Sequence, residues 1–165
     1  MAEFNGVPSG AGRRYAVIAS RFNNHITSKL ADGAMEALVR HGVTAEDIDL
    51  VWVPGAWELP AAARRLLASD RYVGVVAVGA VIRGDTPHFD YVAGEASRGL
   101  ADASAEFDRP IGFGLLTCDT VEQAEARAGG EHGNKGWDAA MAALEMVDLF
   151  DRLEMDADGV EDDAS

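Results

Sequence analysis

The sequence predicts one α/β domain of the three-layer, doubly wound (flavodoxin-like) type, with a four-stranded parallel sheet between two layers of helices. Three observations indicate this fold. Short apolar runs alternate along the chain with segments of helical periodicity. The connections between these runs are long enough to hold a helix, as crossovers between parallel strands require. No internal repeat or interior linker divides the 165 residues, which is about the length of one domain.

The predicted elements follow one another in a regular order. The run RYAVIAS at 14–20 predicts a buried strand. Ile26 and Leu30 recur at helical spacing and predict a helix over 25–42, which Gly42 suits as a C-terminal stop. The remaining strands are predicted at 47–53, 72–82 and 110–118, and the remaining helices at 59–69, 90–107, 121–128 and 137–153.

The chain is strongly acidic, with 28 acidic and 14 basic residues and a net charge of −14. This charge argues against a nucleic-acid-binding protein, which would need a basic face to offset the phosphates. Solubility and adaptation to high salt both stay open as reasons for the charge. The domain is expected to span 14–153, between an N-terminal arm (1–13) and an acidic tail (154–165) that is expected to be disordered.

Neither a membrane protein nor an exported protein is expected. No apolar run approaches the roughly 18 residues that a membrane-spanning helix needs. The N-terminus lacks the basic-then-apolar order of a signal peptide. The single cysteine, Cys118, cannot form an internal disulfide, which fits a reducing compartment. A cytoplasmic location is therefore expected.

The residues that follow each predicted strand are candidates for a binding site, because ligands in this fold bind beyond the carboxyl ends of the strands. Three such loops contain Ser20–Asn23, Pro54–Glu58 and Arg83–His88. Together they would bring two aromatic side chains, a carboxylate and a histidine to one edge of the sheet. This mixture suits a flat ring with polar substituents.

The stretch from Gly84 to His88 predicts an anion site at the start of a helix. Thr86 suits the N-cap position and Pro87 the first helical position. The free N–H groups there and the helix dipole would attract an anion, and Gly84 would let the chain come close to it. His88 would stand beside the anion and could move a proton near neutral pH. The alternative is that Thr86 and Pro87 only begin a helix and that His88 is a surface residue.

Six motifs carry a resemblance to a known family. They are SRFN at 20–23, PGAWELP at 54–60, GAVIRGDTPHFDYV at 79–92, GFGLLT at 112–117, EQAEARAG at 122–129 and GNKGWDAA at 133–140. Together, in this order over roughly residues 14–150, they resemble lumazine synthase. The third and the last motif are highly specific.

The resemblance implies an enzyme of riboflavin biosynthesis. Members of this family condense 5-amino-6-(D-ribitylamino)pyrimidine-2,4-dione with 3,4-dihydroxy-2-butanone 4-phosphate. The product is 6,7-dimethyl-8-ribityllumazine, and phosphate and water are released. The reaction uses neither a metal nor a cofactor, so none is expected, and the expected partners are the two small-molecule substrates.

The resemblance also implies a role for individual residues. His88 would be the catalytic acid and base, Phe22 would stack on the pyrimidinedione ring, and Glu58 would accept hydrogen bonds from the ribityl hydroxyls. Arg127 would clamp the phosphate. The other substrate-binding residues that the resemblance implies are Asn23, Ala56, Trp57, Ala80, Val81, Ile82, Asp85, Thr86, Phe113 and Lys135.

Several of these residues have a second interpretation. Phe22 and Phe113 could be core residues. Glu58 could be a carboxylate favoured by the positive end of a helix dipole. Arg127 could be an exposed helix charge.

The position of Phe113 implies an assembly. It lies near the start of the fourth predicted strand, at the opposite edge from the three loops, so a site that includes it would lie between two chains. The resemblance implies a ring of five, in which the N-terminal arm extends the sheet of a neighbouring subunit. The short, Gly-rich connection at 127–136 resembles shell-forming members, which have an icosahedral shell of 60 subunits. Riboflavin synthase is a further partner to consider.

Two other functions stay open. A protein of the same fold could bind a lumazine or a flavin without turnover, or it could only form a shell. The presence of Glu58, His88 and Arg127 together favours the enzyme.

Overall fold

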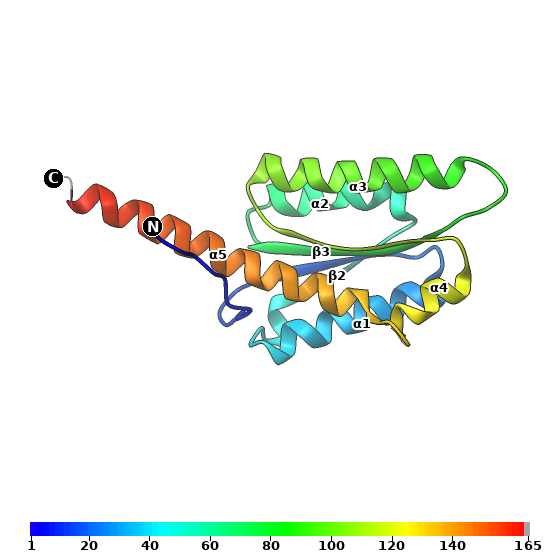
Figure 1. The fold of residues 1–165 in the computed structure, drawn as a ribbon, viewed down its shortest axis with the longest axis horizontal. Helices are drawn as coiled ribbons and strands as arrows, with labels where there is room; N and C mark the ends of the chain where they lie inside the picture. The colour runs from blue at the N-terminus through cyan, green and yellow to red at the C-terminus, as the bar shows by residue number, and fades with distance from the viewer. Residues whose placement is uncertain (164–165) are drawn as a thin grey trace.

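The computed structural model describes residues 1–163 and contains a parallel sheet between two layers of helices (Figure 1). The strands are β1 (Tyr15–Ser20), β2 (Ile48–Val53), β3 (Gly74–Ile82) and β4 (Ile111–Cys118). Their order across the sheet is β2-β1-β3-β4, and every neighbouring pair is parallel. The predicted three-layer, doubly wound fold with four parallel strands is confirmed.

The helices cover the two faces of the sheet unequally. They are α1 (Asn24–Arg40), α2 (Leu59–Ala68), α3 (His88–Phe107), α4 (Val121–Ala126) and α5 (Lys135–Asp163), with two short 3₁₀ helices, η1 (Ala45–Asp47) and η2 (Ala56–Glu58). The helices α2 and α3 lie on one face, and α1, α4 and α5 lie on the other (Figure 1).

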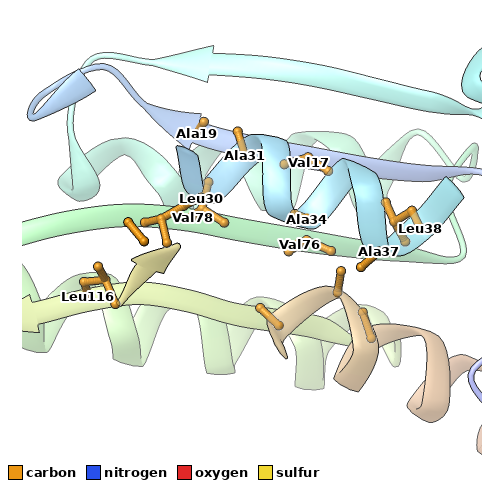
Figure 2. Close-up of a cluster of buried hydrophobic side chains, with 14 of the residues drawn as sticks. Val17, Ala19, Leu30, Ala31, Ala34, Ala37, Leu38, Val76, Val78 and Leu116 are labelled. Atoms are coloured by element: carbon orange, nitrogen blue, oxygen red, sulfur yellow. The ribbon is translucent and has the colours of Figure 1, made fainter. Parts of the chain in front are cut away.

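The side chains of the central strands alternate between these two faces. Val17 of β1 packs beneath α1 together with Val76 and Val78 of β3 (Figure 2), whereas Ile18 packs against α2 and α3. All four are fully buried. Burying a valine or isoleucine side chain contributes about 1.5–3 kcal/mol, so these strands hold the three layers together.

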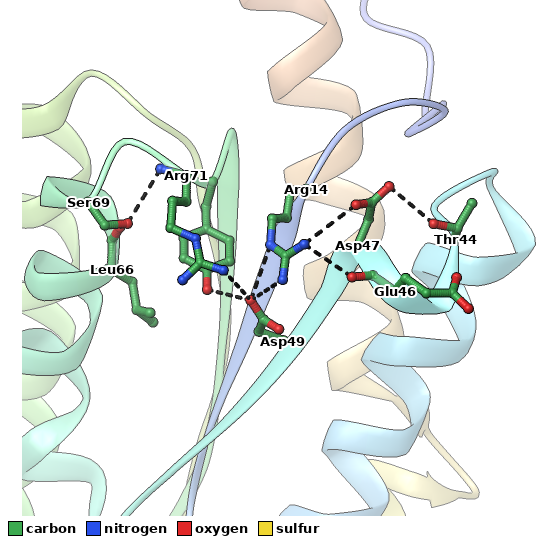
Figure 3. A network of polar contacts seen from close by, with 9 residues as sticks. Arg14, Thr44, Glu46, Asp47, Asp49, Leu66, Ser69 and Arg71 are labelled. Atoms are coloured by element: carbon green, nitrogen blue, oxygen red, sulfur yellow. Dashed lines mark hydrogen bonds and ion pairs between the residues drawn. The ribbon is translucent and has the colours of Figure 1, made fainter.

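One carboxylate joins the amino ends of three strands (Figure 3). Oδ2 of Asp49 in β2 accepts hydrogen bonds from Arg14 Nη2 at 2.8 Å and from the Tyr72 hydroxyl at 2.5 Å. Arg14 directly precedes β1, and Tyr72 lies just before β3. The hydrogen bonds from Tyr72 and Arg14 lower the pKa of Asp49.

The connection between α4 and α5 is a small hairpin, where the sequence predicts only a Gly-rich turn. It pairs β5 (Ala128–Gly130) with β6 (Gly133–Asn134) in antiparallel fashion. Gly129 and Gly133 adopt φ angles of 94° and 74°, a region that favours glycine. The glycines of this connection therefore permit a tight hairpin, and α4 ends at Ala126 instead of residue 128.

The helix α5 is longer than the sequence predicts and extends past the sheet (Figure 1). It runs through Asp163 instead of ending at 153, so the segment expected as a disordered tail is helical up to that residue. Leu153, Glu154 and Met155 favour helix, and no proline follows them. Acidic composition alone is therefore a poor guide to the backbone here. The last two positions of the expected tail lie outside the described residues.

The N-terminal arm follows α5 of its own chain. The Val7 N–H donates a hydrogen bond to Asp148 Oδ2 at 2.7 Å, and Arg13 forms an ion pair with Asp151. Gly6 lies so close to α5 that a Cβ there would be 2.0 Å from Glu145 O. Pairing of this arm with a neighbouring subunit stays a prediction. Within residues 1–163, no helix is long and apolar enough to cross a bilayer.

Candidate functional site

A pocket of about 750 Å³ opens where the loops after β1, β2 and β3 meet. We call it the carboxyl-edge pocket. Its lining residues are Phe22, Pro54, Gly55, Ala56, Trp57, Glu58, Ala80, Val81, Ile82, Gly84, Thr86, His88, Phe89, Tyr91 and Val92. Apolar and aromatic side chains predominate, with a few polar groups, as is typical of small-molecule sites.

The loop after β1 presents an aromatic ring to this pocket. The N–H groups of Arg21 and Phe22 donate to Val53 O and Pro54 O at 2.8 and 3.0 Å, so the pairing of β1 with β2 continues beyond the strands. The Phe22 side chain is left 72% exposed. Asn23 adopts a left-handed φ of 61° and donates from Nδ2 to Ala80 O at 2.9 Å. This bond ties the Phe22 loop to the end of β3.

The loop after β2 is a single 3₁₀ turn that brings Trp57 and Glu58 to the pocket. Glu58 Oε2 accepts a hydrogen bond from the Gly55 N–H at 3.0 Å. The carboxylate therefore caps the N-terminal end of its own turn, close to the helix-terminal role that the sequence suggested as an alternative. It also lines the pocket, so it remains available for a ligand. Trp57 is 57% exposed, so much of its ring is free to contact a ligand.

The end of β3 forms the floor between these loops. The side chains of Ala80 and Ile82 pack with the α1–α5 layer, and Val81 packs on the α2–α3 side. Ala80 and Ile82 therefore line the pocket chiefly through backbone atoms. A planar ring with amide groups could exchange hydrogen bonds with such a strand end.

Arg83 fastens the loop that follows β3. Its Nε donates to Asp119 Oδ1 at 2.9 Å, and its Nη1 lies 3.4 Å from Asp90 Oδ1. The guanidinium carbon is 4.4 Å from the centre of the Phe89 ring. The hydrogen bond to Asp119 is the main reason why the pKa of Arg83 is raised. The loop between Arg83 and α3 is thus held at both ends.

The helix α3 begins at His88, two residues before the predicted start at residue 90 and one residue later than a Thr86 cap implies. His88 is the first helical residue and Pro87 is the N-cap, because Pro87 O accepts the Asp90 N–H at 3.0 Å. Thr86 Oγ1 still accepts a hydrogen bond from the His88 N–H at 3.4 Å. His88 therefore lies at the positive end of a 20-residue helix, beside the pocket.

Comparison of the sequence with known proteins identifies the family. Residues 12–151 match the sequence profile of the 6,7-dimethyl-8-ribityllumazine synthase family. The chain is 68% identical over 152 residues to the 6,7-dimethyl-8-ribityllumazine synthase of Gemmatimonas aurantiaca, which covers 92% of this chain and 93% of the relative. The chain belongs to the lumazine synthase family.

A second relative extends the comparison. The chain is 50% identical over 153 residues to the 6,7-dimethyl-8-ribityllumazine synthase of Aquifex aeolicus, which covers 93% of this chain and 99% of the relative. The lumazine synthase identification made from the six motifs is therefore confirmed. The assignment to an enzyme of riboflavin biosynthesis is confirmed with it.

Most residues expected from the lumazine synthase resemblance meet in the carboxyl-edge pocket. They come from three loops and the first turn of α3, and they are Phe22, Ala56, Trp57, Glu58, Ala80, Val81, Ile82, Thr86 and His88. Asn23 and Asp85 belong to the same loops but do not line the pocket.

Three expected residues of the lumazine synthase site lie elsewhere. Phe113, 53% exposed in β4, lines a separate hollow beside the middle of α3, together with Leu100. Arg127 directly follows α4, which lies on the face of the sheet that α1 and α5 cover (Figure 1). Its Nη1 donates to Gln123 O at 2.9 Å. Lys135 begins α5, with Nζ 3.4 Å from Asp138 Oδ2. One chain therefore does not bring these three side chains to its own pocket.

The pocket also includes residues that the sequence reasoning did not single out. Phe89, Tyr91 and Val92 line it from the first turn and a half of α3, and Tyr91 is 69% exposed. Tyr91 and Val92 lie three and four positions after His88, which places all three on one side of a helix. The helical spacing from His88 therefore predicts that Tyr91 and Val92 line the same pocket.

No group of three or more histidine, cysteine or acidic side chains within residues 1–163 is arranged to hold a metal ion. A second cavity, of about 770 Å³, lies at the amino edge of the sheet, where the Arg109–Asp70 pair and the Arg13–Asp151 pair are found. Parallel α/β sheets bind ligands at the opposite edge. The carboxyl-edge pocket is therefore the better candidate for the active site.

Proposed function

We propose that the carboxyl-edge pocket binds 5-amino-6-(D-ribitylamino)pyrimidine-2,4-dione and that the enzyme condenses it there with 3,4-dihydroxy-2-butanone 4-phosphate. The product is 6,7-dimethyl-8-ribityllumazine. The convergence of Phe22, Glu58 and His88 onto one pocket, from two loops and the first turn of α3, carries this proposal. It supplies a stacking surface, an acceptor for hydroxyls and a proton carrier within one site.

The pocket suits the pyrimidinedione in its shape and polarity. Phe22 offers an exposed ring face for stacking. The strand end at Ala80–Ile82 offers backbone groups for the ring amides. Glu58 and the neighbouring Trp57 line the part that would receive the ribityl chain, where a carboxylate accepts hydrogen bonds from hydroxyls.

The reaction requires several proton transfers, which His88 would carry out. The primary amine attacks the ketone carbon, and the adduct loses water to give an imine. Phosphate then leaves, and the carbon chain isomerises. The ribitylamino nitrogen attacks the remaining carbonyl carbon, and loss of a second water closes the ring. Holding the two reactants together can supply roughly 7–11 kcal/mol of the acceleration, so His88 is one contributor among several.

The phosphate would bind at the start of α3. The N–H groups of Asp85 and Thr86 precede the positive end of this helix, where anions are stabilised. Arg127 and Lys135 would approach from a neighbouring chain, and Phe113 would cover the ring from there. None of these three side chains lines the pocket of its own chain, which supports this arrangement.

The composite site requires a ring of chains. We infer a homopentamer in which each pocket receives Phe113, Arg127 and Lys135 from the neighbouring chain. We further infer that pentamers assemble into an icosahedral shell of 60 subunits. The β5–β6 hairpin keeps the connection between α4 and α5 short. A short connection here resembles that of shell-forming members of the family and supports the shell. A cytoplasmic location and an association with riboflavin synthase complete the proposal.

A direct assay tests this function. The two substrates are mixed with the protein, lumazine formation is followed by absorbance and fluorescence, and released phosphate is measured in parallel. Equal amounts of lumazine and phosphate are expected, above the rate without protein. Tight lumazine or riboflavin binding without acceleration would instead show a storage protein and would overturn the proposal.

A further inference from the structure

The side chain of Asn134 joins three parts of the molecule. Its Oδ1 accepts hydrogen bonds from the N–H groups of Gly136 and Trp137, at 2.8 and 3.2 Å, and so caps the start of α5. Its Nδ2 donates to Lys29 O in α1 at 2.9 Å. Asn134 is also the last residue of the β5–β6 hairpin. One amide group therefore connects this hairpin to two helices.

Two glycines allow the backbones around Asn134 to approach closely. A Cβ on Gly33 of α1 would lie 2.4 Å from the Asn134 side chain, and a Cβ on Gly136 would lie 1.9 Å from Leu30 O. The absence of side chains at both glycines allows α1 and the start of α5 to come this close. The half-buried amide of Asn134 therefore lies between the backbones of α1 and α5, and its three hydrogen bonds orient it.

The hairpin that Asn134 holds is directly attached to Arg127. Asn134 pairs with Ala128 in the β5–β6 register, and the Lys135 N–H donates to Arg127 O at 2.9 Å. The His132 N–H closes the same loop by donating to Ala126 O at 2.8 Å. The backbone of Arg127 is therefore held from both sides by segments that Asn134 fastens to α1.

We propose that Asn134 is a positioning residue for phosphate recognition, acting through Arg127. The inference rests on the proposed function, which assigns Arg127 to the substrate phosphate. A guanidinium binds phosphate through hydrogen bonds of defined geometry, so a small displacement of its backbone weakens the contact. Asn134 itself contacts no substrate in this arrangement.

Two substitutions separate the tie to α1 from the cap of α5. Asn134→Ala removes both. Asn134→Asp retains an oxygen that accepts from Gly136 and Trp137 but has no donor for Lys29 O. Thr44→Ala, which removes an exposed side-chain bond to Asp47 at the other edge of the sheet, is the control. Sedimentation first establishes that each variant assembles like the parent.

The kinetic signature is selective for one substrate. Both Asn134 variants should raise KM for 3,4-dihydroxy-2-butanone 4-phosphate by about tenfold, with KM for the pyrimidinedione changed less than about twofold. Arg127→Ala should show the same selectivity, and the double variant Arg127→Ala/Asn134→Ala should be no worse than Arg127→Ala alone. Hydrogen exchange at the His132 and Lys135 amides should accelerate in the Asn134 variants, independently of turnover.

The possible failures are distinguishable. If Arg127→Ala leaves both KM values unchanged, the proposed phosphate role of Arg127 fails and the inference fails with it. If Arg127→Ala raises KM for the phosphate substrate but Asn134→Asp behaves like the Thr44→Ala control, the inference alone is overturned. Equal rises in both KM values, or additive losses in the double variant, would show a general structural role and would also overturn it.

Discussion

Arg83 and Asp119 join the carboxyl ends of β3 and β4. The Arg83 side chain donates from Nε to Asp119 Oδ1 at 2.9 Å, and the Arg83 backbone N–H donates to Cys118 O at 2.8 Å. The same guanidinium reaches Asp90 and lies over Phe89, both in the first turn of α3. The residues that carry the proposed phosphate loop are therefore anchored to two strands and a helix.

Loss of this anchor should impair the enzyme without unfolding it. Arg83→Met is expected to lower kcat/KM by about tenfold, because the loop before His88 loses its attachment. Arg83→Lys should recover only part of this loss, since an ammonium cannot bridge two carboxylates as a planar guanidinium does. Arg98→Met, which breaks the exposed pair with Glu95 further along α3, is the matched control. A kcat/KM for Arg83→Met equal to that of the control would contradict the prediction.

Removal of the His88 imidazole should slow the condensation. His88→Ala is expected to reduce kcat by about 10- to 1000-fold, in line with general acid–base effects, while assembly stays intact. His25→Ala, an exposed histidine in α1 outside the pocket, serves as the control. A His88→Ala enzyme as fast as the parent would remove this residue from the mechanism.

Mixed assemblies test whether each site combines two chains. His88→Ala and Arg127→Ala should each be impaired alone. When the two are co-expressed, an Arg127→Ala chain can present its intact His88 to the intact Arg127 of a His88→Ala neighbour. Because a head-to-tail interface has a direction, random equal mixing completes about one site in four. Activity should rise towards that fraction above the mean of the single variants.

The experiment requires proof that the two variants assemble into the same rings. Native mass spectrometry establishes that both chains occur in the same ring. If mixed rings are present and activity stays at the mean of the single variants, Arg127 and His88 belong to the same site of one chain.

The size of the assembly is a separate prediction. Light scattering should detect a 60-subunit shell at moderate ionic strength. The net charge of −14 per chain should weaken contacts between pentamers at low salt, because like charges repel and salt screens them. A salt titration should therefore increase the fraction of shells. Pentamers or decamers alone at every salt concentration would refute the shell.

The Asp49 network should contribute to stability in a pH-dependent way (Figure 3). Hydrogen bonds from Tyr72 and Arg14 lower the pKa of Asp49 in the folded protein. Its contribution is therefore fully present above the ordinary carboxyl pKa of about 3.9 and is lost as the pH falls through the lower folded value. Asp49→Asn should lower Tm at pH 7 by roughly 2–6 °C.

The same variant should also change the acid limb of the stability profile. Tm measured between pH 7 and pH 2 should fall less steeply for Asp49→Asn than for the parent, because this carboxylate no longer takes up a proton on unfolding. Asp32→Asn on the exposed surface of α1 is the control. Parallel profiles for the parent and Asp49→Asn would contradict this assignment.

Much of the pocket could be predicted from the sequence for a simple reason. Phe22, Glu58 and His88 each follow an apolar run, and parallel strands place their carboxyl ends at one edge. The exact start of α3 could not be predicted in this way. Thr86 and Pro87 both suit the beginning of a helix, and the choice depends on which backbone carbonyl accepts the first hydrogen bond.

By itself, the sequence determined the alternation of strands and helices, the parallel sheet, the three loops of the pocket and the family. These follow from local periodicity, connection lengths and motifs. The position of Phe113 away from the pocket loops also followed from its place early in the fourth strand. Only the tertiary structure showed that Asn134 fastens the hairpin to α1. The bond from Asn134 to Lys29 joins residues 105 positions apart. Such contacts depend on how distant segments pack, and local sequence patterns do not record this packing.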